Sequence, residues 1–209
     1  MNMRIWEDMI TDRDRIVIEQ GGYGRRTGYG EKPLLLCIDL QPNYIGADAP
    51  IEEQIEQWPS GGGAKAWEGV RHILSLRDAA REAGVPVFYT KNVQSRTDAF
   101  DNFAGKRKRD NAKFIDGHPC SDLLPCIEPL PEEMVLSKGY ASAFYGTPLQ
   151  SYLITLGIDT LILVGAPPAD AAVPLRLTPP QGATGLFMWR TASLTASKYP
   201  IRRRCLISG

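Results

Sequence analysis

The sequence feature that most constrains the fold is an unbroken apolar run that ends in a carboxylate. Five apolar residues (34–38) follow Pro33 and lead directly into Asp39. A run of this length without alternation is typical of a strand that is buried on both faces, as in a parallel sheet covered by helices. Ligands of such sheets bind just outside the carboxyl ends of the strands. Asp39 is therefore either a loop residue or a catalytic acid or base.

Further strand-like segments alternate with helical patterns along the chain. Residues 64–83 carry apolar side chains at three- and four-residue spacing, which indicates an amphipathic helix, and a second helix begins at Pro148. Strand–helix–strand units of this kind predict right-handed crossovers and parallel pairing. We expect an α/β fold of three α-β-α layers around a doubly wound, mostly parallel sheet. The further strands are expected at residues 85–90, 134–137 and 160–164.

Composition limits the classes of function. A chain of 209 residues is long enough for one domain with a full core, and its formal net charge of zero argues against a nucleic-acid or membrane binder. The first thirty residues are charged and lack a signal-peptide core, so a cytoplasmic location is expected. The four cysteines have no metal-ligand spacing, and only His72 and His118 could add imidazoles. We expect no metal and no cofactor.

Residues 1–32 read as an amino-terminal arm. Residues 5–20 predict a strongly charged helix with Thr11 or Asp12 as an internal cap and glycines 21 and 22 as its end. Its few apolar residues suggest that it lies on the domain or on a neighbouring subunit. The glycine-rich residues 22–30 precede a strand instead of linking a strand to a helix, which argues against a phosphate-binding loop.

Ionisable residues follow two more of the expected strands. Lys138 comes directly after the third strand, and Lys91, after the second, is either a site residue or a solvated lysine. Asp39 and Lys138 together suit a site in which an ammonium group stabilises a carboxylate that takes a proton from a third group. That third group, a nucleophile, is best placed after the fourth strand, where the next helix would lower the pKa of a thiol.

The long polar segment 92–131 carries features that could indicate other functions. Its basic run at residues 105–109 has acidic neighbours and no aromatic platform, so a solvated loop is favoured over a nucleic-acid site. His118 lies in an Asp-Gly-His-Pro sequence, which is typical of a turn.

Several motifs occur in the order found in one enzyme family. They are Leu-Cys-Ile-Asp-Leu-Gln at 36–41, Lys138 followed by Ala-Ser-Ala-Phe-Tyr-Gly-Thr-Pro-Leu at 141–149, and Ile-Leu-Val-Gly-Ala at 162–166. Over residues 5–166 the chain resembles isochorismatase-like cysteine hydrolases, in particular the N-carbamoylsarcosine and maleamate amidohydrolase branch. The resemblance implies a homo-oligomer that hydrolyses a small amide or carbamoyl substrate and releases ammonia. It assigns residues 33–166 to the family's α/β domain.

The resemblance also implies roles for individual residues. Asp39 becomes the general base and Lys138 its partner, and Ala166 and Pro167 occupy the region of the oxyanion hole. The family's nucleophile is a cysteine in a Gly-Ala-Thr-Thr-Ser-Gly-Cys-like run, and its position here holds Ala171. Candidate substrate contacts, each equally compatible with packing or surface roles, are Arg25, Gln41, Tyr44 and Tyr145.

The departure from the family extends over all of residues 167–209. This segment holds six basic residues against one acidic residue, a net charge of +5, so the preceding 166 residues carry −5. Three prolines (174, 179 and 180) interrupt the expected helix, and two further buried strands cannot be found. We expect the last strands and helices of the domain to be degraded. The outer edge of the fourth strand would then be exposed and prone to aggregation.

A shifted reading frame explains this segment with one event. The Pro-Pro-Ala-Asp-Ala sequence at 167–171 back-translates to CCN CCN GCN GAY GCN, and regrouping one base earlier permits Thr-Thr-Ser-Gly-Cys with the cysteine at position 171. In the same register, residues 193–198 permit Val-Phe-Asp-Arg-Phe-Gln, which is also similar to the family. The alternative is a naturally divergent tail.

Other functions stay open alongside the amidohydrolase hypothesis. A non-catalytic descendant could bind small molecules or form oligomers with the same fold. Cys120, Cys126 or Cys205 could in principle replace the missing thiol, but their loop and tail positions argue against it. A nucleotide binder would need a glycine-rich turn after the first strand, and Gln-Pro-Asn-Tyr at 41–44 is not that turn.

The frame-shift hypothesis predicts the nucleotide sequence of the gene. Read one base earlier from codon 166 onward, it should encode Thr-Thr-Ser-Gly-Cys and then a continuous stretch with strand and helix periodicity. Sequencing the gene tests this. The absence of that peptide from every frame would eliminate the hypothesis and leave the divergent tail.

Overall fold

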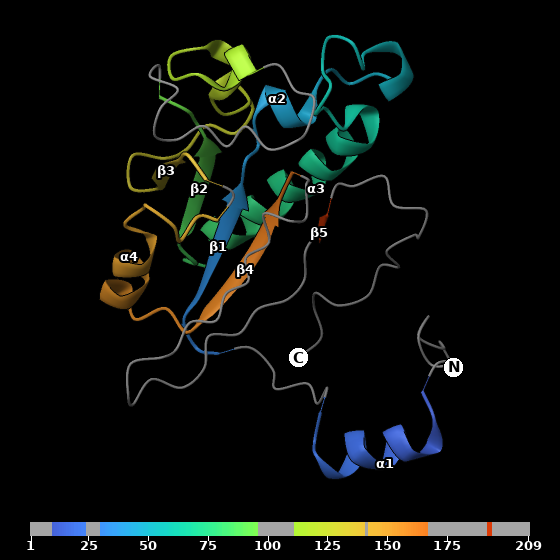
Figure 1. Cartoon of the computed structure of the whole chain (residues 1–209). Coiled ribbons are helices and arrows are strands. Elements are labelled where there is room, and N and C mark those ends of the chain that lie inside the picture. The colour runs from blue at the N-terminus through green and yellow to red at the C-terminus, as the bar shows by residue number, and fades with distance from the viewer. Residues whose placement is uncertain (1–9, 24–29, 96–110, 141, 167–191, 194–209) are drawn as a thin grey trace.

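The computed structural model describes residues 10–23, 30–95, 111–140, 142–166 and 192–193 and shows one parallel sheet (Figure 1). The strands lie in the order β3-β2-β1-β4-β5, and every pair is parallel. Their bounds are β1 Pro33–Ile38, β2 Val87–Asn92, β3 Met134–Lys138, β4 Thr160–Gly165 and β5 Ala192–Ser193. The apolar run of the sequence forms the central strand β1, which is flanked by β2 and β4 and is therefore buried, as predicted.

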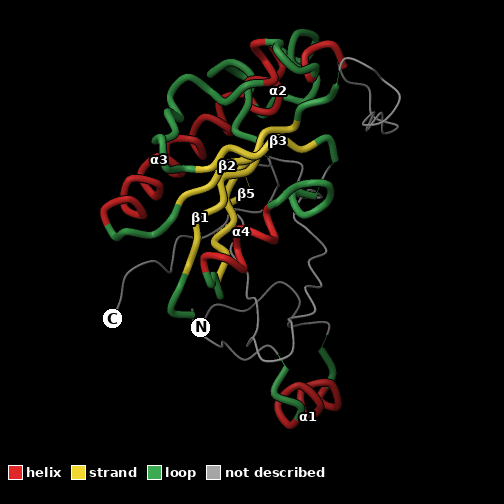
Figure 2. The backbone as a smooth tube through the Cα atoms, turned by 90° about the vertical axis from the view of Figure 1, so that its left-hand side faces the viewer, coloured by secondary structure: helices red, strands yellow, loops and turns green. Residues whose placement is uncertain are grey.

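Helices cover both faces of the sheet (Figure 2). Helix α3 (Gly63–Glu82) buries Val70 and Ile73 in a core that also contains Leu35. Helix α4 (Leu149–Leu156) buries Leu153 in a second core with Leu36. Alternate side chains of β1 thus enter opposite cores. The predicted three-layer α/β fold is confirmed.

The strand order creates a crevice at one place on the sheet. From β1 the chain moves outward to β2 and β3, and it then returns to place β4 on the other side of β1. Because right-handed crossovers in opposite directions put their helices on opposite faces, α3 and α4 lie on different sides. The carboxyl ends of β1 and β4 therefore form the topological switch point, where ligands of open α/β sheets bind.

The second strand begins and ends two residues later than predicted. Pro86 has no N–H to give to the sheet, but its carbonyl oxygen accepts a bond from the Leu35 N–H at 2.9 Å. At the other end the strand continues because Lys91 and Asn92 pair with Ser137 and Lys138 of β3. Similarly, Pro148 is the N-cap of α4 and not a residue of its first turn.

The long connections contain short helices and contribute to the core. These helices are α2 Pro42–Ile45, η2 Ile51–Glu53, η3 Asn111–Phe114 and η4 Pro119–Ser121. The sequence predicted a long polar excursion over residues 92–131, yet Phe114, Leu124 and Ile127 are buried. His118 caps η4, because its Nδ1 accepts a bond from the Cys120 N–H at 3.0 Å. The basic run at 105–109 lies outside the described residues.

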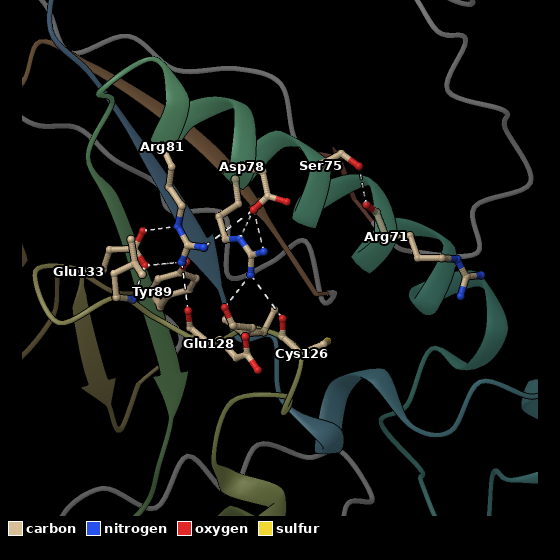
Figure 3. Close-up of polar contacts among 11 residues, drawn as sticks. Arg71, Ser75, Asp78, Arg81, Tyr89, Cys126, Glu128 and Glu133 are labelled. Carbon is tan, nitrogen blue, oxygen red and sulfur yellow. Dashed lines mark hydrogen bonds and ion pairs between the residues drawn. The ribbon is translucent and has the colours of Figure 1, made fainter.

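A polar cluster ties the chain ahead of β3 to α3 (Figure 3). The Arg81 guanidinium donates to both carboxylate oxygens of Glu133 at 2.8 Å, and Tyr89 donates to the same carboxylate at 3.1 Å. Burial raises the pKa of Glu133, but the hydrogen bond from Arg81 and those from Leu130 and Tyr89 outweigh it and leave that pKa lowered. This cluster fixes the start of β3 and so the position of Lys138 at its other end.

The amino-terminal helix is separate from both cores. Helix α1 (Asp12–Gln20) begins with a capping box between Thr11 and Asp14, ends at Gly21 and buries none of its residues. It lies apart from the sheet in both views (Figures 1 and 2). Among the helices of the described ranges, none combines the length and the apolarity that a bilayer crossing requires.

The outer edge of β4 is partly covered. Strand β5 pairs with Val164 and Gly165, at the carboxyl end of β4. The sequence predicted an open edge here because residues 167–209 show no strand pattern. Strand β5 therefore changes the expectation of an open edge only at the carboxyl end of β4, which is the end nearest the crevice.

The packing of α4 on the sheet predicts that two neighbouring residues of this helix contribute very differently to stability. Leu153 is 4% exposed and its neighbour Ile154 is 61% exposed. Leu153→Ala should lower the free energy of unfolding by about 2–5 kcal/mol because it leaves a cavity between helix and sheet. Ile154→Ala, the matched control, should cost less than about 1 kcal/mol. Urea unfolding measures both values, and equal losses would contradict the packing.

Candidate active site

Asp39 occupies the first position beyond β1 and is fixed by its backbone. Its N–H donates to the Thr90 carbonyl at 3.0 Å, and its φ of 53° lies in the left-handed region. Aspartate tolerates this conformation better than most residues, and such backbone geometry clusters at functional sites. The turn keeps the side chain at the switch point, where it is 4% exposed.

Lys138 meets this carboxylate directly. Its Nζ lies 2.7 Å from Asp39 Oδ2, and the Thr90 hydroxyl donates to Asp39 Oδ1 at 2.8 Å. Lys138 is 2% exposed and also donates to the Tyr140 carbonyl at 3.3 Å. Both carboxylate oxygens are therefore paired, which compensates for burying the two charges. The ends of three adjacent strands (β1, β2 and β3) supply this cluster.

The end of β4 lies against the same turn. The Ala166 N–H donates to the Ile38 carbonyl at 3.0 Å. A β-carbon at Gly165 would lie 2.1 Å from that carbonyl oxygen, so only glycine allows this approach. The chain therefore leaves β4 in contact with the backbone of Ile38, the residue that precedes Asp39. Pro167 and Ala171, predicted for the oxyanion region and the nucleophile position, lie outside the described residues.

Gln41 holds the backbone at the end of β2 beside the site. It is fully buried, and its carboxamide bonds both backbone groups of Asn92 (Oε1 at 2.7 Å from the N–H, Nε2 at 3.1 Å from the carbonyl). Its Nε2 also donates to the Ser121 carbonyl at 2.6 Å. These bonds give Gln41 a positioning role, and its predicted contact with substrate stays a prediction.

The two tyrosines predicted to touch substrate lie in different surroundings. Tyr44 is buried and packs edge-to-face against Phe114, with ring centroids 5.3 Å apart. Tyr145 is 64% exposed and packs in the same way against Tyr140 at 4.7 Å. Their roles in substrate binding stay predictions, and Arg25 lies outside the described residues.

The cysteines that the structure describes are poor replacements for a nucleophile. Cys37 lies inside β1, where burial raises the pKa of its thiol to about 12. Burial also raises the pKa of Cys126. Cys120 lies in η4, in the connection before β3. Cys205 lies outside the described residues. In the parts of the chain that are described, His, Cys, Asp and Glu side chains form no group of three that could hold a metal ion.

Sequence reasoning missed Thr90 and Asn92. Both follow the apolar start of β2 and point to the same face, since residues two apart in a strand share a side. The signal that could have found them is a polar residue at every second position beyond Phe88, in a strand otherwise buried on both faces. Lys91, between them, points to the other face and pairs with Asp122 at 3.1 Å.

Comparisons with known proteins show the family to which the chain is similar. The isochorismatase domain pattern matches residues 33–167. The chain is 35% identical over 148 residues to maleamate amidohydrolase of Pseudomonas putida, covering 70% of this chain and 64% of that protein. It is 33% identical over 164 residues to N-carbamoylsarcosine amidase of an Arthrobacter species, covering 72% and 54%. The matches thus span less than two thirds of either relative's length.

A solved structure supports the fold independently. Pyrazinamidase/nicotinamidase from Streptococcus mutans superposes with a TM-score of 0.53 at 21% identity, covering 65% of this chain and 72% of that one. At this identity the likeness concerns the fold alone.

The buried ion pair predicts a stability difference between two lysines. Lys138→Met leaves the Asp39 carboxylate buried without its cation and should lower the free energy of unfolding by about 3–5 kcal/mol. Lys91→Met removes a partly exposed pair with Asp122 and should cost about 0–1 kcal/mol. Adding Asp39→Asn to Lys138→Met should recover part of the loss, because no buried charge then stays unpaired. Urea unfolding of these three variants and of Asp39→Asn alone measures the coupling, and additive losses at positions 39 and 138 would contradict it.

Proposed function

The chain belongs to the isochorismatase family, and from this we propose that its site is built to hydrolyse a small amide or carbamoyl group with release of ammonia. The observation that carries the proposal is the buried contact between Asp39 and Lys138 at the switch point, 2.7 Å long, beside the end of β4. The names of two relatives, maleamate amidohydrolase and N-carbamoylsarcosine amidase, suggest the substrate class.

The proposed chemistry needs a thiol beyond β4. Asp39 takes the proton of the cysteine, and the thiolate attacks the amide carbon. The C–N bond breaks, the nitrogen leaves with a proton as ammonia, and water hydrolyses the resulting thioester. Backbone N–H groups after β4 stabilise the oxyanion, and Lys138 keeps Asp39 ionised and in place. The motifs demand no metal and no cofactor.

We further propose that this polypeptide has little or no amidase activity of its own. Position 171 holds alanine, and Pro167 has no N–H for an oxyanion. Residues 167–209 then replace the rest of the α/β domain, either through the shifted frame or through divergence. Assembly into a homo-oligomer and a cytoplasmic location stay predictions from the sequence.

One observation favours a second function. The Asp39–Lys138 pair and its Thr90 and Gln41 contacts are intact although the nucleophile position lacks a thiol. A chain with such a site can bind a small amide without cleaving it. The alternative is therefore a non-catalytic protein that binds small molecules or forms oligomers.

Ammonia release from maleamate and from N-carbamoylsarcosine tests the proposal. The chain as it stands should be at least ~10³-fold slower than the product of the other reading frame, because removing a nucleophile costs an enzyme at least this much. In the product of the other frame, replacing the thiol at position 171 by alanine should abolish the difference.

Two results would count against the proposal. Equal turnover by the chain itself would show that position 171 is not the nucleophile. No turnover by the other-frame product, if it folds, would favour the non-catalytic alternative.

A further inference from the structure

Two buried polar atoms, one at the end of β2 and one just beyond it, have no partner. Among all described residues, the buried side-chain atoms without a hydrogen bond are Asn92 Oδ1 and Gln94 Nε2. Asn92 is 2% exposed and Gln94 is 3% exposed. An unpaired buried polar group is destabilising, so folded proteins seldom keep one without a reason. One of these two atoms is an acceptor and the other is a donor.

The strand register places Asn92 beside the candidate active site. Asn92 pairs with Lys138 across β2 and β3, and paired residues of parallel strands share a face. It also shares that face with Thr90, two residues earlier, whose hydroxyl donates to Asp39. The Asn92 carboxamide therefore lies next to Lys138, and it is one position farther along this face of β2 than Thr90.

The backbone of Asn92 is fixed by two hydrogen bonds with the Gln41 side chain. Gln41 bonds both its N–H and its carbonyl oxygen, so the backbone of Asn92 cannot shift to bring Oδ1 to another partner. Gln94, two residues beyond the end of β2, is also held by its backbone, since its N–H donates to the Phe114 carbonyl at 2.8 Å and its carbonyl accepts from the Asp116 N–H at 2.9 Å. Both backbones are thus held in place while one polar side-chain atom of each residue stays unpaired.

We propose that Asn92 is a specificity residue that accepts a hydrogen bond from an N–H of the bound substrate. This inference rests on the proposed function and deepens it by naming the recognised group. A carboxamide, carbamoyl or ureido group offers an N–H to Asn92 Oδ1, while its carbonyl oxygen faces the backbone N–H groups after β4. An ester of the same shape offers only acceptors, so it leaves Oδ1 unpaired. The unpaired Asn92 acceptor therefore selects amides over esters.

Equilibrium binding tests the inference without turnover, because the chain has alanine at position 171. Maleamate and monomethyl maleate, its ester counterpart, are titrated into the full chain in a calorimeter. The unaltered chain should bind maleamate about 10-fold or more tightly than the ester, the factor expected for one unpaired buried acceptor. Asn92→Leu should remove this preference by weakening maleamate alone. Lys91→Met, one residue away on the opposite face, should leave both affinities unchanged.

A thermal melt without ligand separates binding from a structural role. Asn92→Leu removes a buried acceptor that has no partner, so its melting temperature should stay equal or rise. A lower melting temperature with unchanged affinity for maleamate would overturn the inference. So would equal affinity of the unaltered chain for amide and ester. Both results leave the proposed function standing, whereas failure of the unaltered chain to bind either probe would overturn the two together.

Discussion

The buried contact between the Asp39 carboxylate and the Lys138 ammonium organises the carboxyl edge of the sheet. It joins residues 99 positions apart, from β1 and β3, across the intervening β2. Burying two charges is costly, and the cost is compensated only where geometry and additional hydrogen bonds are good. Here Thr90 occupies the second carboxylate oxygen and the Tyr140 carbonyl receives a further bond from the lysine. The three strand ends must therefore keep their register for the pair to form.

The parallel sheet supplies that register and also directs where chemistry can occur. The chain adds β2 and β3 on one side of β1 and β4 on the other. The carboxyl ends of the neighbouring strands β1 and β4 therefore border the crevice. Glycine at 165 lets β4 approach the Ile38 carbonyl, and Ala166 closes the contact with its N–H. A nucleophile carried on the chain beyond Ala166 would begin its path beside the acid–base pair. The same arrangement makes a lost thiol consequential, because the described cysteines lie in β1, in η4 and in the connection before β3, and none of them follows β4.

Much of this architecture could be predicted from the sequence, because parallel strands are continuous apolar runs and ionisable residues at their ends are conspicuous. Asp39 and Lys138 carry that signal, and so does the amphipathic pattern of α3. Thr90 and Asn92 were missed although they alternate with apolar positions in the sequence, since such polar residues show their roles only when their partners, or the lack of them, are known. The positioning role of Gln41 could not be predicted either, because its side chain bonds backbone atoms 51 positions away in the sequence. The two-residue strand β5 is too short to leave any periodicity.

The arginine cluster on α3 gives the two rims of the sheet different resistance to local opening. Arg77 donates to the Cys126 and Ile127 carbonyls, and Arg81 donates to the Glu128 carbonyl and to Glu133, so the segment leading into β3 is fastened to a long helix at the amino-end rim. Local opening of this segment therefore requires the loss of these side-chain bonds in addition to the pairing of β3 with β2. The crevice rim depends instead on the buried Asp39–Lys138 pair and the Thr90 hydrogen bond, so a substitution at one rim leaves the charged contacts of the other rim in place.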